Sequence, residues 1–338
     1  MIYIYHVCDL RPRPEVLSYI GGTMEQFYIV LNQIGIFVLL ILVGIMAMKF
    51  GILDKHSLGN LSKVVMRIAL PAYIFINTAE GATREGLAAS LMVIPLAIAL
   101  YALLFLLSRV LEKVFGLTGN RAKVYRALMM FGNVGFMGIP LVIELYPDTA
   151  LLYISLFTIL DQALFWTYGV SLTYPVVEGK KEKFSLSNLK NVLSPALVAI
   201  LLATVLVLLN VHLPNVLVQT CTKLGGASMP LSLLYIGGML STVDIRGALK
   251  CKEIYGEIIC KMLVLPILYF LVMKGLGIAP DLAGTVTFLT GLPAINMVAM
   301  LAKNNGSDGD YAVCAVMMTT IACLVTLPLI SLGIALLG

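Results

Sequence analysis

One stretch of the sequence combines an amide that could bind an anion with residues that could break a helix. It reads "FGNVGFMGIPLV" (131–142) and contains three glycines, one proline and one amide: Gly132, Gly135, Gly138, Pro140 and Asn133. Proline removes a backbone N–H and obstructs the carbonyl one turn earlier, and glycines three residues apart let another segment come close. The start of a half-helix carries partial positive charge, and an asparagine amide can donate to a carboxylate without a fixed charge. These residues predict an anion site at a broken helix.

A second stretch has the same ingredients. "TGLPAINMVA" (290–299) places Pro293 and Asn296 between apolar residues, as Asn133 and Pro140 are placed in the first stretch. Each residue also has a purely structural interpretation: the asparagines could make hydrogen bonds between helices, and the prolines could be tolerated kinks. The matched placement favours two helix breaks that meet.

The composition places both stretches in a membrane. Of the 338 residues, 60% are hydrophobic and 12% are charged, and the apolar runs have the length of about 20 residues that crosses a bilayer. The fold class is therefore an all-α polytopic membrane protein. In lipid an unpaired backbone group costs several kcal/mol, so an irregular backbone must face protein or a water-filled cavity.

Apolar runs separated by charged or Gly/Pro-rich breaks predict ten spans. They cover residues 27–48, 62–79, 88–108, 124–146, 150–173, 193–210, 219–241, 256–274, 281–302 and 311–337. Eighteen lysines and arginines follow the odd-numbered spans, and five lie on the opposite side. By the positive-inside rule, both termini of this multi-pass protein lie outside the cytoplasmic (plasma) membrane.

The most polar stretch, "EGKKEKFSLSNLK" (178–190), divides the spans into two sets of five. The expected organisation is an N-terminal tail over 1–23, a first repeat over 24–174, a cytoplasmic linker over 175–192 and a second repeat over 193–338. The tail is either a short disordered segment or precedes a true start at Met24. Five is odd, so equivalent repeats would be inverted, and this predicts broken, crossing helices 4 and 9.

Four motifs together resemble the auxin efflux carrier family. They are "GNVGFMGIPL" after a basic loop, "LPAYIF", "LPAINMVAMLAKNNG" and "TTIACLVTLPLI", in that order over nearly the whole chain from Met24. The family comprises bacterial malate- and malonate-type permeases and the plant PIN auxin exporters. The resemblance implies a bile-acid/arsenite/auxin transporter-like fold, a 5+5 inverted repeat with a scaffold group and a transport group of helices, organic-anion substrates and a homodimer. The long cytoplasmic loop of many plant members is missing here.

By that resemblance, the substrate-binding residues are Asn133, Gly135, Pro140, Pro293 and Asn296. The expected function is secondary active transport of a small organic anion by alternating access, with proton or sodium symport as the open choices. Malate, malonate, an amino-acid-derived anion and an indole acid all remain open as substrates. No cofactor is expected, and the other partner is membrane lipid.

A carboxylate inside span five is the candidate for the coupling ion. Asp161 lies about eleven residues from either end of the span, next to Gln162. A carboxylate in the membrane is costly and is a functional-site hypothesis by default, although a structural hydrogen-bonded role fits equally. Other polar residues suggest simpler roles: Glu144 a solvated carboxylate, Asn77 a helix-end cap, and Glu257 with Lys261 an i, i+4 ion pair near the cytoplasmic face.

Other function classes fit the sequence less well. The six cysteines form no C-x-x-C pair, so neither a metal site nor a disulfide framework is expected, and the basic charge reports orientation rather than nucleic-acid binding. The P-loop motif and the H-E-x-x-H motif are both missing from the sequence. An intramembrane hydrolase using Ser228 would have no intramembrane histidine as base, so no enzyme is expected. A membrane sensor acting with a separate partner is the alternative.

Overall fold

The computed structural model describes residues 32, 35–81, 90–176, 195–242 and 249–337. Within these residues the regular structure is helical, apart from one isolated bridge between Gly132 and Ala294. The predicted tail over 1–23 and almost all of the predicted linker over 175–192 lie outside the described residues.

Among the described residues, five helices are long and apolar enough to cross a membrane. They are Lys55–Glu80, Ser90–Val114, Ala150–Leu172, Lys252–Gly275 and Gly309–Leu337, and a shorter apolar helix covers Gly35–Lys49. These helices make the chain a polytopic, multi-pass membrane protein of the all-α class, as the composition predicts.

The long helices are composed of shorter elements. They contain α2 (Lys55–Val64) and α3 (Leu70–Gly81), then α5 (Val93–Val114), α8 (Ala150–Leu164) and α9 (Val170–Leu172), then α15 (Lys252–Ile259), α16 (Leu265–Gly275) and α19 (Gly309–Leu337). A five-residue π-helical turn joins α2 to α3, α8 to α9 and α15 to α16. Such widened turns occur frequently at functional sites.

Shorter helices lie between the long ones. They are α6 (Gly119–Met130), α7 (Ile139–Leu145), α11 (Pro195–Leu208), α12 (Asn215–Gly226), α13 (Ser228–Leu240), α17 (Pro280–Thr290) and α18 (Asn296–Asn304). Helices α6 and α7, and likewise α17 and α18, occupy single predicted spans that are interrupted in the middle. Helices α12 and α13 follow one another with only Ala227 between them.

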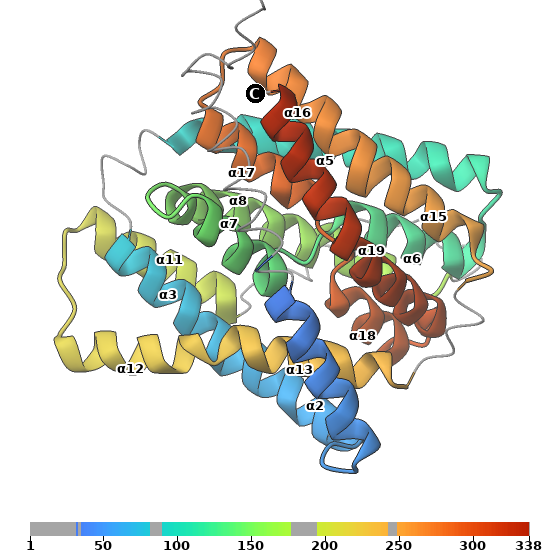
Figure 1. Ribbon diagram of the computed structural model, residues 1–338, viewed down its shortest axis with the longest axis horizontal. Helices are drawn as coiled ribbons and strands as arrows, with labels where there is room; N and C mark the ends of the chain where they lie inside the picture. Colours follow the sequence, from blue (N-terminus) through green and yellow to red (C-terminus); the bar gives the residue numbers. More distant parts are fainter. Residues whose placement is uncertain (1–31, 33–34, 82–89, 177–194, 243–248, 338) are drawn as a thin grey trace, which may run out of the picture.

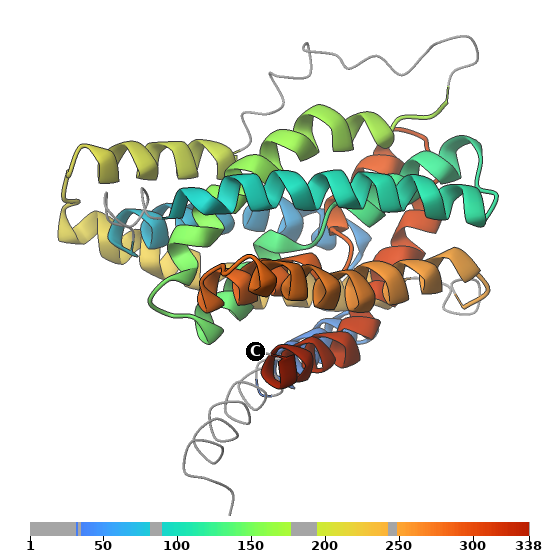
Figure 2. The same ribbon diagram turned by 90° about the horizontal axis from the view of Figure 1, so that it is seen from above.

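The helices form two packed groups, which Figure 1 shows side by side. One group contains α2, α3, α11, α12 and α13, and α3 packs against both α11 and α12. The other contains α5, α6 and α15 to α19, in which α5 packs on α6, α16 on α17 and α18 on α19. Helix α8 contacts members of both groups. Figure 2 shows α11 and α12 at the opposite end of the molecule from α6 and α15.

Two glycines let helices of the first group touch backbone to backbone. A Cβ added to Gly44 would lie 2.3 Å from the Leu234 carbonyl oxygen, and one added to Gly237 would lie 2.0 Å from the Ile41 carbonyl oxygen. Any side chain at these positions would therefore push the helix Gly35–Lys49 away from α13. The sequence analysis did not single out these glycines.

The molecule is apolar outside and partly charged inside. Leu106, Val325 and Leu336 are more than half exposed, on α5 and α19. In contrast, Asp161, Glu257 and Lys261 have at most 1% of their surface exposed. This distribution suits a lipid-facing surface, and charges inside a membrane protein mark functional regions.

Candidate functional site

The first helix break lies at Phe131–Asn133. Helix α6 ends at Met130, Phe131 has an extended backbone, and helical structure resumes at Val134 in a π-helical turn that leads directly into α7. The break therefore precedes Pro140 by seven residues, and Pro140 itself lies in the helix that follows the break. The π turn absorbs the proline, because the Ile139 N–H reaches back to the Val134 carbonyl.

The second break lies at Gly291–Ile295, between α17 and α18. Here Pro293 is inside the break, as the sequence predicts, and Asn296 is the first residue of α18. The Ala294 N–H donates to the Thr319 hydroxyl on α19 at 3.2 Å, so α19 supplies a partner for the irregular backbone. That bond satisfies one of the donors that a break leaves open.

The two breaks hydrogen-bond to each other. The Asn133 N–H donates to the Pro293 carbonyl at 2.8 Å, and the Ile295 N–H donates to the Phe131 carbonyl at 3.1 Å. Gly132 and Ala294 form an antiparallel bridge between them. A Cβ on Gly132 would lie 3.2 Å from the Leu292 Cβ, so glycine keeps this approach short. Segments some 160 residues apart in the sequence thus replace their lost helical bonds with one another.

Both asparagine side chains are buried at these breaks with amide nitrogens that donate to nothing. Asn133 is 1% exposed and its Nδ2 has no hydrogen bond, and Asn296 is 8% exposed and neither its Nδ2 nor its Oδ1 has one. A buried amide without a partner costs about 1–3 kcal/mol. The interpretation in which these amides only join helices does not describe Asn296, because neither of its side-chain polar atoms has a hydrogen-bond partner.

Asn296 faces a small internal cavity. The cavity has a volume of about 20 Å³ and is lined by residues of α13, α18 and α19, including Tyr235, Asn296, Met317 and Thr320. The Thr320 hydroxyl is also buried without a hydrogen-bond partner. A space of this size holds about one water molecule. Two unsatisfied polar groups therefore line a cavity at the first turn of α18.

A larger cavity of about 570 Å³ lies next to the small one. Leu240 and Met317 line both, so these two side chains stand between them. The large cavity is bounded by the helix Gly35–Lys49, the end of α13 and α19, and its lining includes the ionisable residue Lys49. Its volume is that of a small-molecule pocket.

Three of the predicted binding residues meet at the paired breaks, and one of these, Asn296, lines the small cavity. Asn133, Pro293 and Asn296 meet at the paired breaks, whereas Gly135 packs against Leu70, whose Cδ2 would lie 3.3 Å from an added Cβ. Pro140 lies in the first turn of α7. Sequence reasoning missed Thr319 and Thr320, although the paired threonines in "MTTIAC" were a visible signal of polar groups inside a span.

Asp161 is part of a closed hydrogen-bond network. The Tyr101 hydroxyl donates to its Oδ1, and the Gln162 amide donates to its Oδ2 at 3.1 Å. The Trp166 indole N–H in turn donates to the Gln162 Oε1 at 3.1 Å. Both carboxylate oxygens therefore have partners from the protein.

Glu257 and Lys261 form a buried pair, and not the pair near the surface that their spacing suggests. The Lys261 Nζ lies 3.6 Å from the Glu257 Oε1, and the two side chains are 1% and 0% exposed. The same Nζ donates to the Leu128 carbonyl in the last turn of α6 at 2.8 Å. This lysine thus connects the second half of the chain to the helix that precedes the first break. By contrast, Glu144 is exposed, as predicted.

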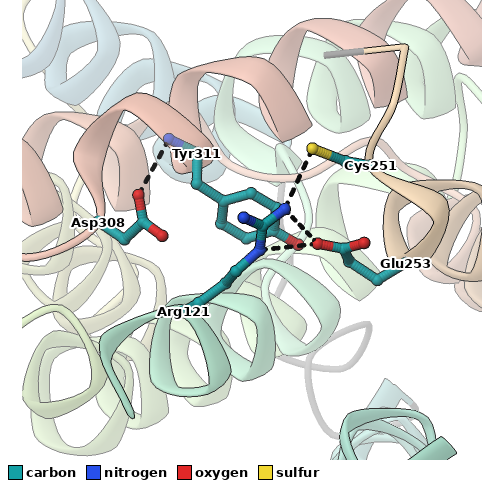
Figure 3. Close-up of polar contacts among 5 residues, drawn as sticks. All are labelled: Arg121, Cys251, Glu253, Asp308 and Tyr311. Carbon is teal, nitrogen blue, oxygen red and sulfur yellow. Dashed lines mark hydrogen bonds and ion pairs between the residues drawn. The ribbon is translucent and has the colours of Figure 1, made fainter. Parts of the chain in front are cut away.

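A polar cluster at one end of α6 joins three helices, as Figure 3 shows. The Arg121 guanidinium donates to Glu253 Oε1 at 2.8 Å through Nε and at 2.5 Å through Nη2, and also to the Cys251 sulfur. The guanidinium also lies 4.3 Å from the centre of the Tyr311 ring. The backbone N–H of Tyr311 donates to the Asp308 carboxylate. No group of acidic, histidine or cysteine side chains with metal-ligand geometry occurs among the described residues.

Comparison with known proteins agrees with this architecture. The family model described as membrane transport protein matches residues 29–331. An uncharacterized transporter of Methanothermobacter thermautotrophicus is 26% identical over 306 residues, which cover 86% of this chain and 93% of the relative. An uncharacterized transporter of Methanocaldococcus jannaschii is 24% identical over 305 residues, covering 87% of this chain and 95% of the relative. The chain therefore belongs to the membrane transport protein family, the auxin efflux carrier family that its motifs resemble, and is a transporter rather than an enzyme.

Proposed function

We propose that this protein is a secondary active transporter of a small organic anion, a carboxylate such as malate or malonate, across the cytoplasmic membrane. The observation that carries the proposal is the pair of buried amide nitrogens of Asn133 and Asn296, which have no hydrogen-bond partner at the paired helix breaks, together with the cavity that Asn296 lines. Helix N-termini favour anions, and amide donors add directed hydrogen bonds.

The chemistry of the site suits binding followed by release. Asn133 and Asn296 offer neutral donors, while Gly135, Pro140 and Pro293 shape the backbone on which those donors sit. A fixed lysine or arginine at the same place would hold a carboxylate more tightly and slow its departure. Weak, directed contacts are what a carrier needs when it must give up its substrate on the far side.

The proposed architecture is ten spans as a 5+5 inverted repeat with both termini outside the cell. In this orientation the large cavity that contains Lys49 opens toward the cytoplasm, and its lysine attracts anions from that side. Leu240 and Met317 then separate the cytoplasmic cavity from the Asn296 cavity. Alternating access would move the second group of helices against the first and open the amides to each side in turn.

Coupling to protons or sodium is part of the proposal. Asp161 and Gln162 are the candidates that the sequence offers, and their network lies within one helix, α8, and its neighbour α5. A coupling ion bound there would have to replace at least one of the hydrogen bonds that Asp161 accepts. A homodimer is proposed from the family resemblance alone.

The test is uptake by proteoliposomes of radiolabelled malate, malonate and indole-3-acetate, with and without proton and sodium gradients. Asn133→Ala and Asn296→Ala should each lower uptake at least about tenfold, the loss of one to two donors to a charged group. Both variants should fold, because the paired breaks are held by backbone hydrogen bonds that neither substitution removes. Asn60→Ala, on an exposed face of α2, is the matched control. Normal uptake by both amide variants would refute the site.

A further inference from the structure

Three ionisable side chains lie one turn apart along α15 and the π turn that follows it. Glu253 is at the rim, where its side chain is 9% exposed and binds Arg121. Glu257 comes next and is fully buried, and Lys261 follows at 1% exposure. Together they form a series of charged groups that runs from the end of the helix into the interior of the second group of helices.

Glu257 differs from the other acids because its carboxylate is incompletely solvated by the protein. Neither of its oxygens accepts a hydrogen bond, and its closest cation, Lys261, is 3.6 Å away. Two buried hydroxyls without partners, on Tyr125 of α6 and Tyr311 of α19, lie within electrostatic range of it. An ionised carboxylate in such surroundings is costly, and a proton relieves that cost.

The Lys261 ammonium lies between two acceptors and is closer to one of them. Its Nζ is 2.8 Å from the Leu128 carbonyl and 3.6 Å from the Glu257 carboxylate. The Leu128 carbonyl belongs to the last turn of α6, where carbonyls lack partners within the helix. In the geometry seen here, the lysine holds the end of α6 and leaves the glutamate incompletely paired.

We propose that Glu257 binds the coupling proton of the carrier and that Lys261 reports its protonation to the helix break. When Glu257 is protonated, Lys261 stays on the Leu128 carbonyl and holds α6 against α15. When Glu257 loses the proton, Lys261 moves toward the carboxylate and releases the end of α6, five residues before Asn133. The proposal rests on the proposed transport function, for which it supplies the coupling group.

The charge balance explains why the proton and the anion would travel together. With Glu257 ionised, the pair is neutral; with Glu257 protonated, the pair carries one positive charge. That charge lies close to the helix that leads into the anion site, and a bound carboxylate neutralises it. In a low-dielectric interior, proton and anion then each improve the binding of the other.

The surroundings offer the proton a route and set the local charge. The titratable groups within electrostatic range of the pair or of its two tyrosine neighbours include Arg121 and Tyr125 on α6, Tyr311 on α19, Glu253 and Cys260 on the same long helix, and Asp161 on α8. Glu253, Arg121 and Tyr311 form the cluster of Figure 3 at the rim. A proton from the aqueous side would therefore meet Glu253 first and then Glu257, one helical turn deeper.

Infrared difference spectroscopy of the purified carrier, between pH 8 and pH 5, tests proton binding without transport. The wild type should gain the band of a buried protonated carboxyl, Glu257→Gln should lose that band, and Asp161→Asn should retain it. Retention of the full band by Glu257→Gln would overturn the proposal. Because no substrate is present, this experiment is independent of the proposed function.

Proteoliposomes test the coupling. Glu257→Gln, which fixes the pair in its positively charged form, should still exchange malate at equilibrium, but an inward proton gradient should no longer stimulate its uptake. The control Glu144→Gln, at an exposed carboxylate, should keep the stimulation. Stimulation of Glu257→Gln equal to that of the wild type, or stimulation by sodium alone, would overturn the proposal. Should Glu257→Gln fail to fold, Glu257→Asp should shift the pH midpoint of uptake, and an unchanged midpoint would contradict the proposal. A wild type that shows the infrared band but exchanges no carboxylate would instead refute the proposed substrate.

Discussion

Asp161 and Glu257 are both buried carboxylates in the membrane part of the chain, yet their surroundings differ. Tyr101 and Gln162 donate to the two oxygens of Asp161, whereas the oxygens of Glu257 accept no hydrogen bond. Accepted hydrogen bonds offset part of the cost of burying a charged carboxylate, and Glu257 lacks that compensation. The comparison therefore favours Glu257 over Asp161 as the acid that exchanges a proton.

The largest effect should come from removing the cation of the Glu257 pair. Lys261→Met leaves an uncompensated carboxylate and takes the donor away from the Leu128 carbonyl. We expect the free energy of unfolding at pH 8 to fall by about 3–5 kcal/mol. At pH 5 the carboxyl takes up a proton, so the loss should shrink. Unfolding of the detergent-solubilised protein, followed by circular dichroism at the two pH values, measures both numbers.

Two variants serve as controls for that loss. Glu257→Gln should lower the free energy of unfolding by less than Lys261→Met does. In this variant Lys261 still donates to the Leu128 carbonyl and still has the negative charge of Asp161 nearby. The double variant should recover most of the stability, as replacement of a whole buried ion pair usually does. A Lys261→Met protein as stable as the wild type at pH 8 would show that the pair is not ionic.

An intermediate effect should follow from disturbing the network of Asp161. Asp161→Asn directs an amide N–H₂ at the Gln162 amide or withdraws an acceptor from Tyr101, so one buried donor loses its partner. The expected loss is about 1–3 kcal/mol in the same unfolding assay. The pH dependence of uptake should stay that of the wild type. If this variant instead abolished the response to a proton gradient, the roles of the two carboxylates would be reversed.

The sequence predicted the helix breaks better than it predicted their details. Residues 131–142 and 290–299 were correctly chosen, because glycine, proline and asparagine in an apolar run have no ordinary helical explanation. Within the first stretch, the structure places the break at Gly132 and the extended Phe131, while a π turn accommodates Pro140. Whether a proline breaks or only widens a helix depends on the partners of the freed backbone groups, and those partners come from distant segments.

The ionisable groups show the same limit. The i, i+4 spacing predicted the Glu257–Lys261 pair, but it did not predict that the pair is buried. The burial depends on α6 and α19, which are distant in the sequence. Asp161 was recognised as an intramembrane carboxylate, yet its structural partner Tyr101 lies 60 residues away. The backbone contacts of Gly44 and Gly237 were missed for the same reason. Hydrophobic periodicity and composition predict the helices, whereas contacts between distant segments determine the partners of each polar residue.

The smallest effect should come from a carboxylate in water. Asp54 caps α2, and both the hydroxyl and the N–H of Ser57 donate to its Oδ1 at 2.6 Å. The hydrogen bond from the Ser57 hydroxyl, with that from the backbone, lowers the pKa of Asp54 from its usual 3.8. A lowered pKa in the folded state means that the cap stabilises at pH values above the unfolded pKa and loses that contribution as the pH falls through the folded value. Asp54→Ala should therefore lower the melting temperature slightly at pH 7, and this difference should shrink as the pH falls below 3.8. Asp54→Asn keeps a capping oxygen but does not titrate, so the difference in melting temperature between Asp54→Asn and Asp54→Ala should depend little on pH. If the difference between the wild type and Asp54→Ala were also independent of pH, the effect would come from helix propensity and not from charge.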